Sequence, residues 1–81
     1  MAVVEVILPK WGLTMEEGAL VEWEVKEGDR VTEGQVIAHV ETDKVLSDLE
    51  APTGGIVKSL KFEAGTESIP VGAVLCEIEE S

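Results

Sequence analysis

The sequence repeats itself, and the spacing of its glycines shows the repeat. Three pairs of glycines are separated by 37, 37 and 38 residues, namely Gly18 and Gly55, Gly28 and Gly65, and Gly34 and Gly72. Apolar positions coincide under the same shift, so that residues 36–41 fall on residues 74–79. A repeat of a few short strands cannot bury its apolar face alone, so the two copies should share one core. The repeat therefore predicts one domain with a quasi-two-fold axis.

The length and composition agree with a small globular protein. The chain has 81 residues, of which 44% are hydrophobic, and no apolar run approaches the roughly 18 residues that cross a bilayer. Its first residues lack the basic and apolar segments of a secretory signal and the arginine bias of a transit peptide. We expect one domain over residues 1–81, away from membranes. Its expected location is the bacterial or archaeal cytoplasm, or the mitochondrial matrix if a transit peptide has been removed.

The charge argues against a nucleic-acid partner. Six Lys and Arg residues stand against 17 Asp and Glu residues, which gives a formal net charge of −11. Phosphate binding needs clustered basic side chains, so partners that are steered electrostatically should instead present basic surfaces. The many carboxylates are typical of a solvated surface rather than a metal cage. His39 has no second His or Cys near it in sequence and is expected to lie on the surface.

Short apolar or alternating segments between glycine turns predict an all-β protein. Six strands are expected, over residues 3–8, 19–26, 36–41, 45–51, 56–62 and 74–78. In the second strand Val21, Trp23 and Val25 alternate with charged residues, which predicts that all three face the core. Residues 69–72 are expected to form a turn, and Cys76 is expected to pack in the core. Such regularly spaced strands are typical of a small sandwich or flattened barrel.

A loop near the N-terminus distinguishes the first half from the second. Pro9 precedes Gly18 by nine residues and Pro52 precedes Gly55 by three, so the first half has about six additional residues if the prolines correspond. The additional segment, residues 10–17, is unusually apolar for a loop. Two interpretations remain open: the loop recognises a partner, or its apolar side chains fold back and cap the core.

A lysine lies at the join between the two halves. Residues 41–44 read Glu-Thr-Asp-Lys and connect two expected strands, which places Lys44 in a hairpin. Asp43 can stabilise the turn, because Asp side chains readily hydrogen-bond to nearby backbone groups. A lysine in such a turn is ordinarily a charged surface residue. At the tip of a symmetric scaffold it is also a candidate for covalent modification.

With these motifs in place, the chain resembles the lipoyl domains of 2-oxo acid dehydrogenase complexes. The resemblance rests on residues 41–45, ETDKV, followed by residues 51–55, APTGG, and extends through residues 8–12, 16–18, 26–29 and 70–72. It implies a flattened β-barrel, or barrel-sandwich hybrid, of two four-stranded antiparallel sheets with quasi-two-fold symmetry. It also implies that the lysine hairpin lies at the end opposite the two termini.

The function that the resemblance implies is that of a carrier without catalytic activity. Lys44 matches the lysine that is joined through an amide to lipoate, Asp43 matches a residue of the hairpin that the attaching enzyme recognises, and Val45 is its other flank. The resemblance implies reductive acylation by a thiamine-diphosphate-dependent 2-oxo acid dehydrogenase, transfer of the acyl group at an acyltransferase, and reoxidation by dihydrolipoamide dehydrogenase. The chain is accordingly expected to be a monomeric module of an acyltransferase of pyruvate or acetoin type.

Partner recognition is expected around the hairpin and the N-terminal loop. The residues expected to contribute are Glu41, Thr42, Trp11, Leu13, Met15 and Glu16. Biotinyl carrier domains also resemble this chain, but methionines usually flank their lysine, whereas Asp43 and Val45 stand here and favour lipoate. A lipoylated glycine-cleavage carrier ranks behind these because it is longer. An unmodified β module is the remaining alternative.

Overall fold

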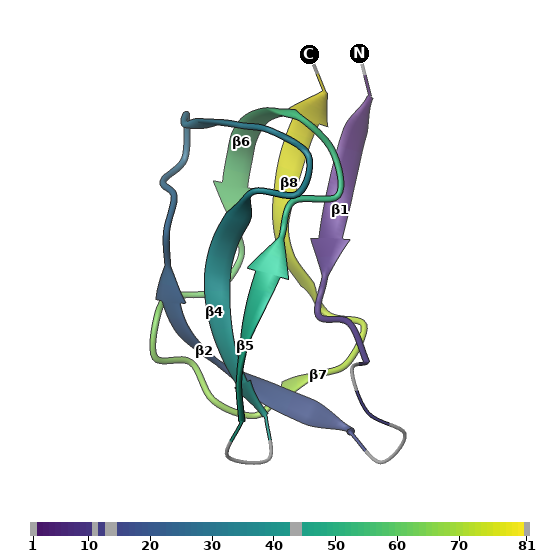
Figure 1. The fold of residues 1–81 in the computed structure, drawn as a ribbon, viewed down its shortest axis with the longest axis vertical. Coiled ribbons are helices and arrows are strands. Elements are labelled where there is room, and N and C mark those ends of the chain that lie inside the picture. The colour runs from purple at the N-terminus through teal and green to yellow at the C-terminus, as the bar shows by residue number, and fades with distance from the viewer. Residues whose placement is uncertain (1, 11, 13–14, 43–44, 81) are drawn as a thin grey trace.

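The computed structural model describes residues 2–10, 12, 15–42 and 45–80. Over these residues the chain is built from strands and contains no helix that could cross a membrane. The eight strands are β1 (Val3–Ile7), β2 (Glu17–Trp23), β3 (Arg30–Val31), β4 (Val36–Thr42), β5 (Val45–Glu50), β6 (Gly55–Leu60), β7 (Ile69–Pro70) and β8 (Val74–Glu80). All six expected strands are present (Figure 1).

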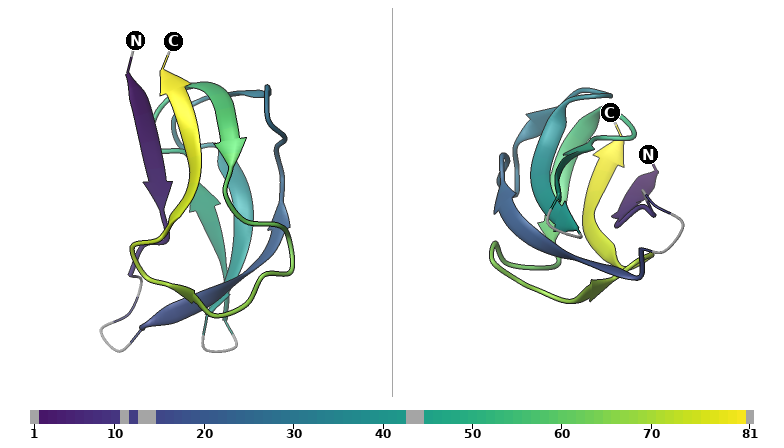
Figure 2. Two further views of the ribbon diagram at one scale, coloured as in Figure 1. Left: turned by 180° about the vertical axis from the view of Figure 1, so that it is seen from behind. Right: turned by 60° about the horizontal axis from the view of Figure 1, so that its bottom comes forward.

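The strands form two four-stranded antiparallel sheets that face each other around one core (Figure 2). Their orders are β1-β8-β6-β3 and β5-β4-β2-β7. Each strand of the first sheet corresponds to the strand four places away in the chain: β1 to β5, β8 to β4, β6 to β2 and β3 to β7. The two sheets therefore have the same order of corresponding strands. The predicted flattened barrel with quasi-two-fold symmetry is confirmed. β4 ends and β5 begins at one end of the long axis, whereas β1 begins and β8 ends at the other (Figure 1).

The core repeats along with the topology. β4 contributes the buried side chains of Ile37, Ala38 and Val40, and β8 contributes their equivalents, which are also buried: Leu75, Cys76 and Ile78. Each of these two strands pairs on both sides, so it occupies an inner position of its sheet. Cys76 is a core residue as predicted, and desolvation, followed by the charge of Glu77, raises the pKa of its thiol to about 11.

One short strand corrects the sequence analysis. Residues 69–72 were expected to form a turn, but Ile69 and Pro70 form β7 and pair with Gly18 and Glu17. Proline is tolerated here because β7 is at the edge of its sheet, where its missing N–H leaves no neighbouring strand unsatisfied. The two-residue strand β3 is its equivalent in the other sheet.

A β-bulge corrects a second expectation. The β2–β4 register shifts between Leu20 and Glu22, so Val21 is the extra residue. Leu20 is therefore buried, whereas the side chain of Val21 remains 45% exposed instead of facing the core with Trp23 and Val25. The β6–β8 register shifts between Val57 and Ser59, each 37 residues later, so the bulge belongs to the repeat.

Backbone hydrogen bonds align the prolines of the two halves. The N–H groups of Leu8 and Ala51 donate to the carbonyls of Ala73 and Gln35, which are equivalent residues of the repeat. Pro9 and Pro52 follow directly, so they correspond, and residues 10–17 contain the additional segment of the first half as predicted. The repeated glycines at positions 28, 34, 65 and 72 all have positive φ, between 86° and 94°, which explains why the turns preserve them.

A pair of charged side chains on the outer face of one half has its equivalent in the other half, but the acidic and basic members are exchanged. His39 Nε2 lies 2.6 Å from Glu24 Oε2, and its Nδ1 lies 3.0 Å from Asp48 Oδ1. The residues equivalent to His39 and Glu24 are Glu77 and Lys61, whose Oε1 and Nζ atoms are 3.4 Å apart. His39 is thus a surface residue, as predicted, and its hydrogen bonds with Glu24 and then Asp48 raise its pKa.

We predict that Gly55→Ala destabilises the fold by about 2–3 kcal/mol, the cost of overpacking a rigid contact. A Cβ at Gly55 would overlap the carbonyl oxygen of Glu79 and lie 2.8 Å from its carbonyl carbon, so backbone must move. Urea unfolding measures the change. Gly12→Ala is the control, because a Cβ there meets nothing within 4 Å. Equal unfolding midpoints for the two variants would contradict the prediction.

We predict that His39→Gln removes a pH-dependent part of the stability. Because folding raises the pKa of His39 above its ordinary value of 6.5, its stabilising contribution is fully present below that pH. The contribution is lost as pH rises through the folded-state pKa. Thermal unfolding should be measured from below pH 6.5 to above the folded-state pKa of His39. The melting temperature of the original protein should fall as pH rises through this range, and that of His39→Gln should change less. Parallel profiles would contradict the prediction, because any contribution of His39 to stability would then be independent of pH.

Candidate functional site

The two strands on either side of Lys44 remain paired up to the residues next to the link between them. Thr42, which ends β4, and Val45, which begins β5, are register partners. Only positions 43 and 44 connect them, which agrees with the hairpin predicted from sequence. Asp43 and Lys44 themselves lie outside the described residues, so their assigned roles remain predictions. The strand ends on either side of them define the frame of the site.

A glycine on the neighbouring strand supports this frame. A Cβ at Gly18, on β2, would lie 2.9 Å from Thr42 Cγ2 and 3.2 Å from Val40 Cγ1. The missing side chain therefore lets β2 pack closely against the last residues of β4. In the sequence Gly18 marks the repeat, and its contact with Thr42 follows only from the pairing of β2 with β4.

A small hollow lies beside the end of β4. Its volume is about 240 Å³, and it is lined by Glu17, Gly18, Ala19, Glu41, Thr42, Glu67 and Ser68. Two predicted recognition residues, Glu41 and Thr42, are thus brought together with Glu67 from the β6–β7 connection. Sequence reasoning did not single out Glu67, because its approach to β4 depends on the fold. The lining carries three carboxylates and no Lys or Arg.

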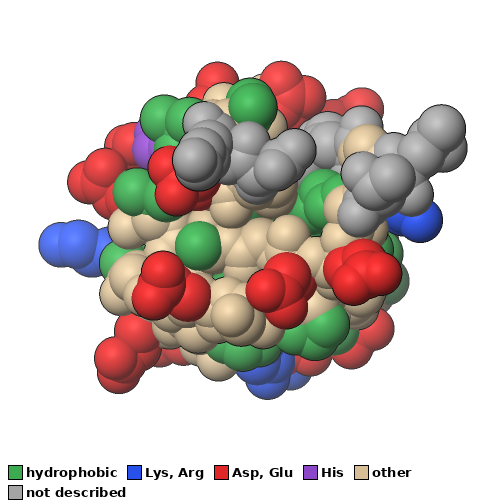
Figure 3. Space-filling view, turned by 90° about the horizontal axis from the view of Figure 1, so that it is seen from below, with side chains coloured by type: hydrophobic (Ala, Val, Ile, Leu, Met, Phe, Trp, Pro, Cys, Tyr) green, Lys and Arg blue, Asp and Glu red, His purple; other side chains and the backbone are tan. Residues whose placement is uncertain are grey.

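The start of β5 exposes two apolar side chains. Val45, the predicted flank of the lysine, and Leu46 are each 60% exposed, more than any other large hydrophobic residue that the structure describes. Leu46 was not among the predicted site residues, although two consecutive apolar residues in an edge strand imply that one faces outward. Viewed toward this end, red carboxylates of the described residues stand out around the molecule, and the described Lys and Arg side chains lie at its margin (Figure 3).

The described residues of the N-terminal loop decide in part between the two interpretations, capping of the core and recognition of a partner. Met15 is half-buried and packs against the core, which supports the capping interpretation for this residue. Glu16 is exposed, and its carbonyl accepts a hydrogen bond from Val71 N–H, so the end of the loop is tied to the region after β7. Trp11 and Leu13 lie outside the described residues. Their role in partner recognition remains a prediction, as does that of Glu16.

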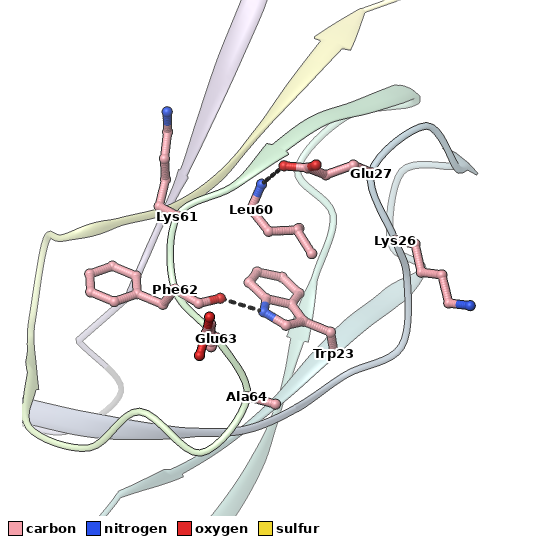
Figure 4. Close-up of a pocket in the computed structure, with 8 residues that line it drawn as sticks. All are labelled: Trp23, Lys26, Glu27, Leu60, Lys61, Phe62, Glu63 and Ala64. Atoms are coloured by element: carbon pink, nitrogen blue, oxygen red, sulfur yellow. Dashed lines mark hydrogen bonds between the residues drawn. The ribbon is translucent and has the colours of Figure 1, made fainter.

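A larger open hollow lies away from these residues, where the connections that follow β2 and β6 meet (Figure 4). It has a volume of about 720 Å³ and is lined by Trp23, Lys26, Glu27, Leu60, Lys61, Phe62, Glu63 and Ala64. Trp23 packs against the core, as predicted, and its indole Nε1 donates a hydrogen bond of 2.9 Å to the Phe62 carbonyl. Three pairs of these residues are equivalent in the repeat, so the hollow lies across the quasi-two-fold axis.

Within the described residues, no three His, Cys, Asp or Glu side chains gather as they would around a metal ion. The geometry that remains is a half-buried strand end at Thr42 and an exposed one at Val45, joined by two residues, one of them a lysine. Such a site can present a group to other proteins.

Comparisons with known proteins agree with this geometry. The biotin/lipoyl family described as "Biotin-requiring enzyme" matches residues 4–78. The acetyltransferase component of the pyruvate dehydrogenase complex of Rhizobium meliloti is 44% identical over 72 residues, which are 89% of this chain and 16% of that protein. The acetyltransferase component of the acetoin cleaving system of Pseudomonas putida is 41% identical over 73 residues, 90% of this chain and 20% of that protein.

A solved structure shows the same fold. The lipoyl domain of the 2-oxoglutarate dehydrogenase complex from Azotobacter vinelandii superposes with a TM-score of 0.74 at 22% identity, covering 94% of this chain and 98% of that one. The chain spans no more than a fifth of the two acetyltransferases, so it corresponds to one module of such proteins. Its family implies a covalently attached group of the lipoate or biotin type. The chain belongs to the biotin/lipoyl attachment family, as a non-catalytic carrier domain of the kind found in dihydrolipoyllysine acetyltransferases.

Proposed function

We propose that residues 1–81 form one lipoyl domain and that Lys44 is its attachment site. The observation that carries the proposal is the register pair Thr42 and Val45, which leaves only positions 43 and 44 to connect β4 with β5. These strand ends lie at the end of the molecule away from the start of β1 and the end of β8 (Figure 1). An amine held there is accessible to an enzyme without any opening of the core.

Lipoate rather than biotin is supported by the flanking residues and by the relatives. Asp43 and Val45 stand where biotinyl domains usually have methionines, and the relatives are named for a dihydrolipoyllysine residue. In the attachment, the neutral Lys44 amine forms a bond to the carboxyl carbon of activated lipoate and loses a proton, and the activating group leaves. The product is an amide, which removes the positive charge of the lysine.

In the carrier function, lipoate and the protein have different roles. When bound, lipoate supplies a dithiolane that can accept an acyl group with reduction and pass it on. The chain supplies the rigid frame around position 44 and the surface that partners recognise. Tethering to a larger protein raises the effective concentration at each partner. The partners are the attaching enzyme, a 2-oxo acid decarboxylase, an acyltransferase and dihydrolipoamide dehydrogenase.

The names of the relatives also support a substrate class and a location. Both the pyruvate and the acetoin relatives are acetyltransferase components, so we assign an acetyl group to this carrier. The relatives come from bacteria and, in Caenorhabditis elegans, from a mitochondrial complex. These sources support the cytoplasm or the mitochondrial matrix as the compartment.

The first prediction for this site concerns the mass of the protein. After coexpression with a lipoate ligase and supplied lipoate, intact-mass measurement should show one lipoyl addition to the original chain and none to Lys44→Arg. Lys26→Arg is the matched control and should be modified normally, because Lys26 lies away from the β4–β5 link. A biotinyl addition, or a lipoyl addition to Lys44→Arg, would contradict the proposal.

The second prediction concerns the position of the lysine in the link. Combining Asp43→Lys with Lys44→Asp preserves composition and charge but shifts the amine by one residue toward β4. We expect lipoylation to be lost, because the attaching enzyme recognises an amine at one position of a fixed frame. The measurement is again the intact mass, with thermal unfolding as the check on folding. Normal lipoylation of a folded exchange variant would refute the importance of position.

A further inference from the structure

The glycine that lies beside the end of β4 has an equivalent at the opposite end of the molecule. Gly18 approaches Thr42, the last residue of β4, and Gly55 pairs with Glu80, the last residue of β8. Each glycine also pairs with a two-residue edge strand, β7 in the first case and β3 in the second. Folding therefore makes the same demand on both glycines, a close approach of neighbouring strands. Of the two, Gly18 is the one that borders the link through position 44.

The position of Gly18 is fixed from the side away from β4. Gly18 pairs with Ile69 of β7, whose side chain is buried, and Glu17 pairs with Pro70. Leu20, two residues further along β2, is buried in the core. β2 is thus held by β7 and by the core, so a side chain added at position 18 has to be accommodated by β4.

The neighbours of Gly18 on β4 have little freedom to turn aside. A Cβ at position 18 would lie 2.9 Å from Thr42 Cγ2 and 3.2 Å from Val40 Cγ1, and both distances are shorter than an ordinary van der Waals contact. Thr and Val are β-branched, which restricts rotation about χ1. Val40 is also buried. The contact is therefore relieved by a displacement of the last residues of β4.

Such a displacement reaches both ends of the link. Thr42 is the register partner of Val45, so the residues that precede and follow the link are paired with each other. β5 lies at the edge of its sheet, and the side chain of Val45 is exposed. Little packing therefore opposes a shift of the start of β5 together with the end of β4.

Attachment of lipoate is the step that depends most directly on this frame. The amine of Lys44 itself has to reach the carboxyl carbon of activated lipoate, and it is carried only by the side chain of the lysine. Misplacing a reacting group by about 1 Å can lower a rate by up to about 100-fold. After attachment the reacting atoms lie at the end of a longer flexible arm, which can compensate for a small shift of its base.

We propose that Gly18 is a positioning residue for lipoate attachment. Its missing side chain allows β2 to fix the end of β4 at Thr42, and this contact sets the place from which Lys44 is presented to the attaching enzyme. The inference rests on the proposed function. Gly18 acts through Thr42 rather than on the reacting atoms. Gly55 has the same packing role at the other end of the molecule and has no part in attachment.

The test measures the initial rate of lipoylation of the purified, unmodified domain by a lipoate ligase supplied with lipoate and ATP, followed by intact mass. Gly18→Ala should lower kcat/KM roughly tenfold, because the end of β4 is displaced. Gly55→Ala is the matched control and should change kcat/KM by less than about twofold once the rate is corrected for the folded fraction. Urea unfolding of each variant supplies that fraction.

A second control is destabilised without any added contact. Gly34 has a φ of 86°, and a Cβ there meets nothing within 4 Å, so Gly34→Ala is strained only through its backbone. Gly34 lies just before the start of β4, at the end of this strand away from the link. Its folded molecules should be lipoylated at the original rate. Losses in Gly34→Ala or Gly55→Ala equal to that in Gly18→Ala would show a general effect of stability and overturn the inference.

Exchange of one methyl group across the contact tests the route through Thr42. Thr42→Ser removes Cγ2 and keeps the hydroxyl, so its combination with Gly18→Ala moves a methyl group from β4 to β2 at nearly constant volume. The double variant should recover to within about threefold of Thr42→Ser, which supplies the reference rate. A double variant as slow as Gly18→Ala would overturn the inference. If Gly18→Ala alone does not fold, a folded double variant well below this range would do the same.

A structural readout accompanies the rates. In the unmodified domain labelled with ¹⁵N, Gly18→Ala should shift the amide resonances of Thr42 and Val45, and the double variant should return the resonance of Val45 toward its position in Thr42→Ser. Gly55→Ala should leave both resonances in place. Unchanged resonances at Thr42 and Val45 in folded Gly18→Ala would contradict the displacement on which the inference depends.

The inference and the proposed function fail in different ways. Lipoylation of the original chain, and its absence in Lys44→Arg, establish the attachment site without reference to Gly18. If the original chain gains no lipoyl group, the proposed function fails and the inference fails with it. If the original chain is lipoylated and folded Gly18→Ala is lipoylated at the same rate, the inference about Gly18 fails alone.

Discussion

The structure depends on the packing of β4 and β8, the two inner strands that lie 38 residues apart in the repeat. Each contributes three buried side chains in the same order, and neither half has enough apolar surface to form a core alone. Joining the halves buries both faces at once. The quasi-two-fold axis, the two equivalent sheets and the equivalent bulges all follow from this shared core.

The same symmetry separates the proposed attachment site from the chain ends. At one end of the molecule, Thr42 pairs with Val45 and the link through positions 43 and 44 joins them. At the equivalent place at the other end, beside the start of β1 and the end of β8, Glu80 N–H donates to the Ala2 carbonyl. The molecule is 35 Å long, so the start of β1 and the end of β8 lie far from the β4–β5 link. This arrangement suits a carrier that must enter the sites of its partners.

Departures from symmetry are informative because the fold does not require them. The end of the additional loop packs against the core through Met15 and is joined to the region after β7 through the Glu16 carbonyl. The pair His39–Glu24 has reversed charges in its equivalent, Glu77–Lys61, so both halves retain a side-chain contact here while their surface charges differ. Recognition can therefore differ between the two faces without a change in the core.

The sequence by itself determined the repeat, the long strands, the buried Cys76 and the place of Lys44 between two strands, because glycine spacing and apolar alternation are local patterns. It did not determine that Val21 faces solvent, that Ile69 and Pro70 pair with β2, or that Glu67 lies beside Thr42. Those features depend on the register between segments far apart in the chain. A bulge shifts which side chains face the core, and only the neighbouring strand fixes its position.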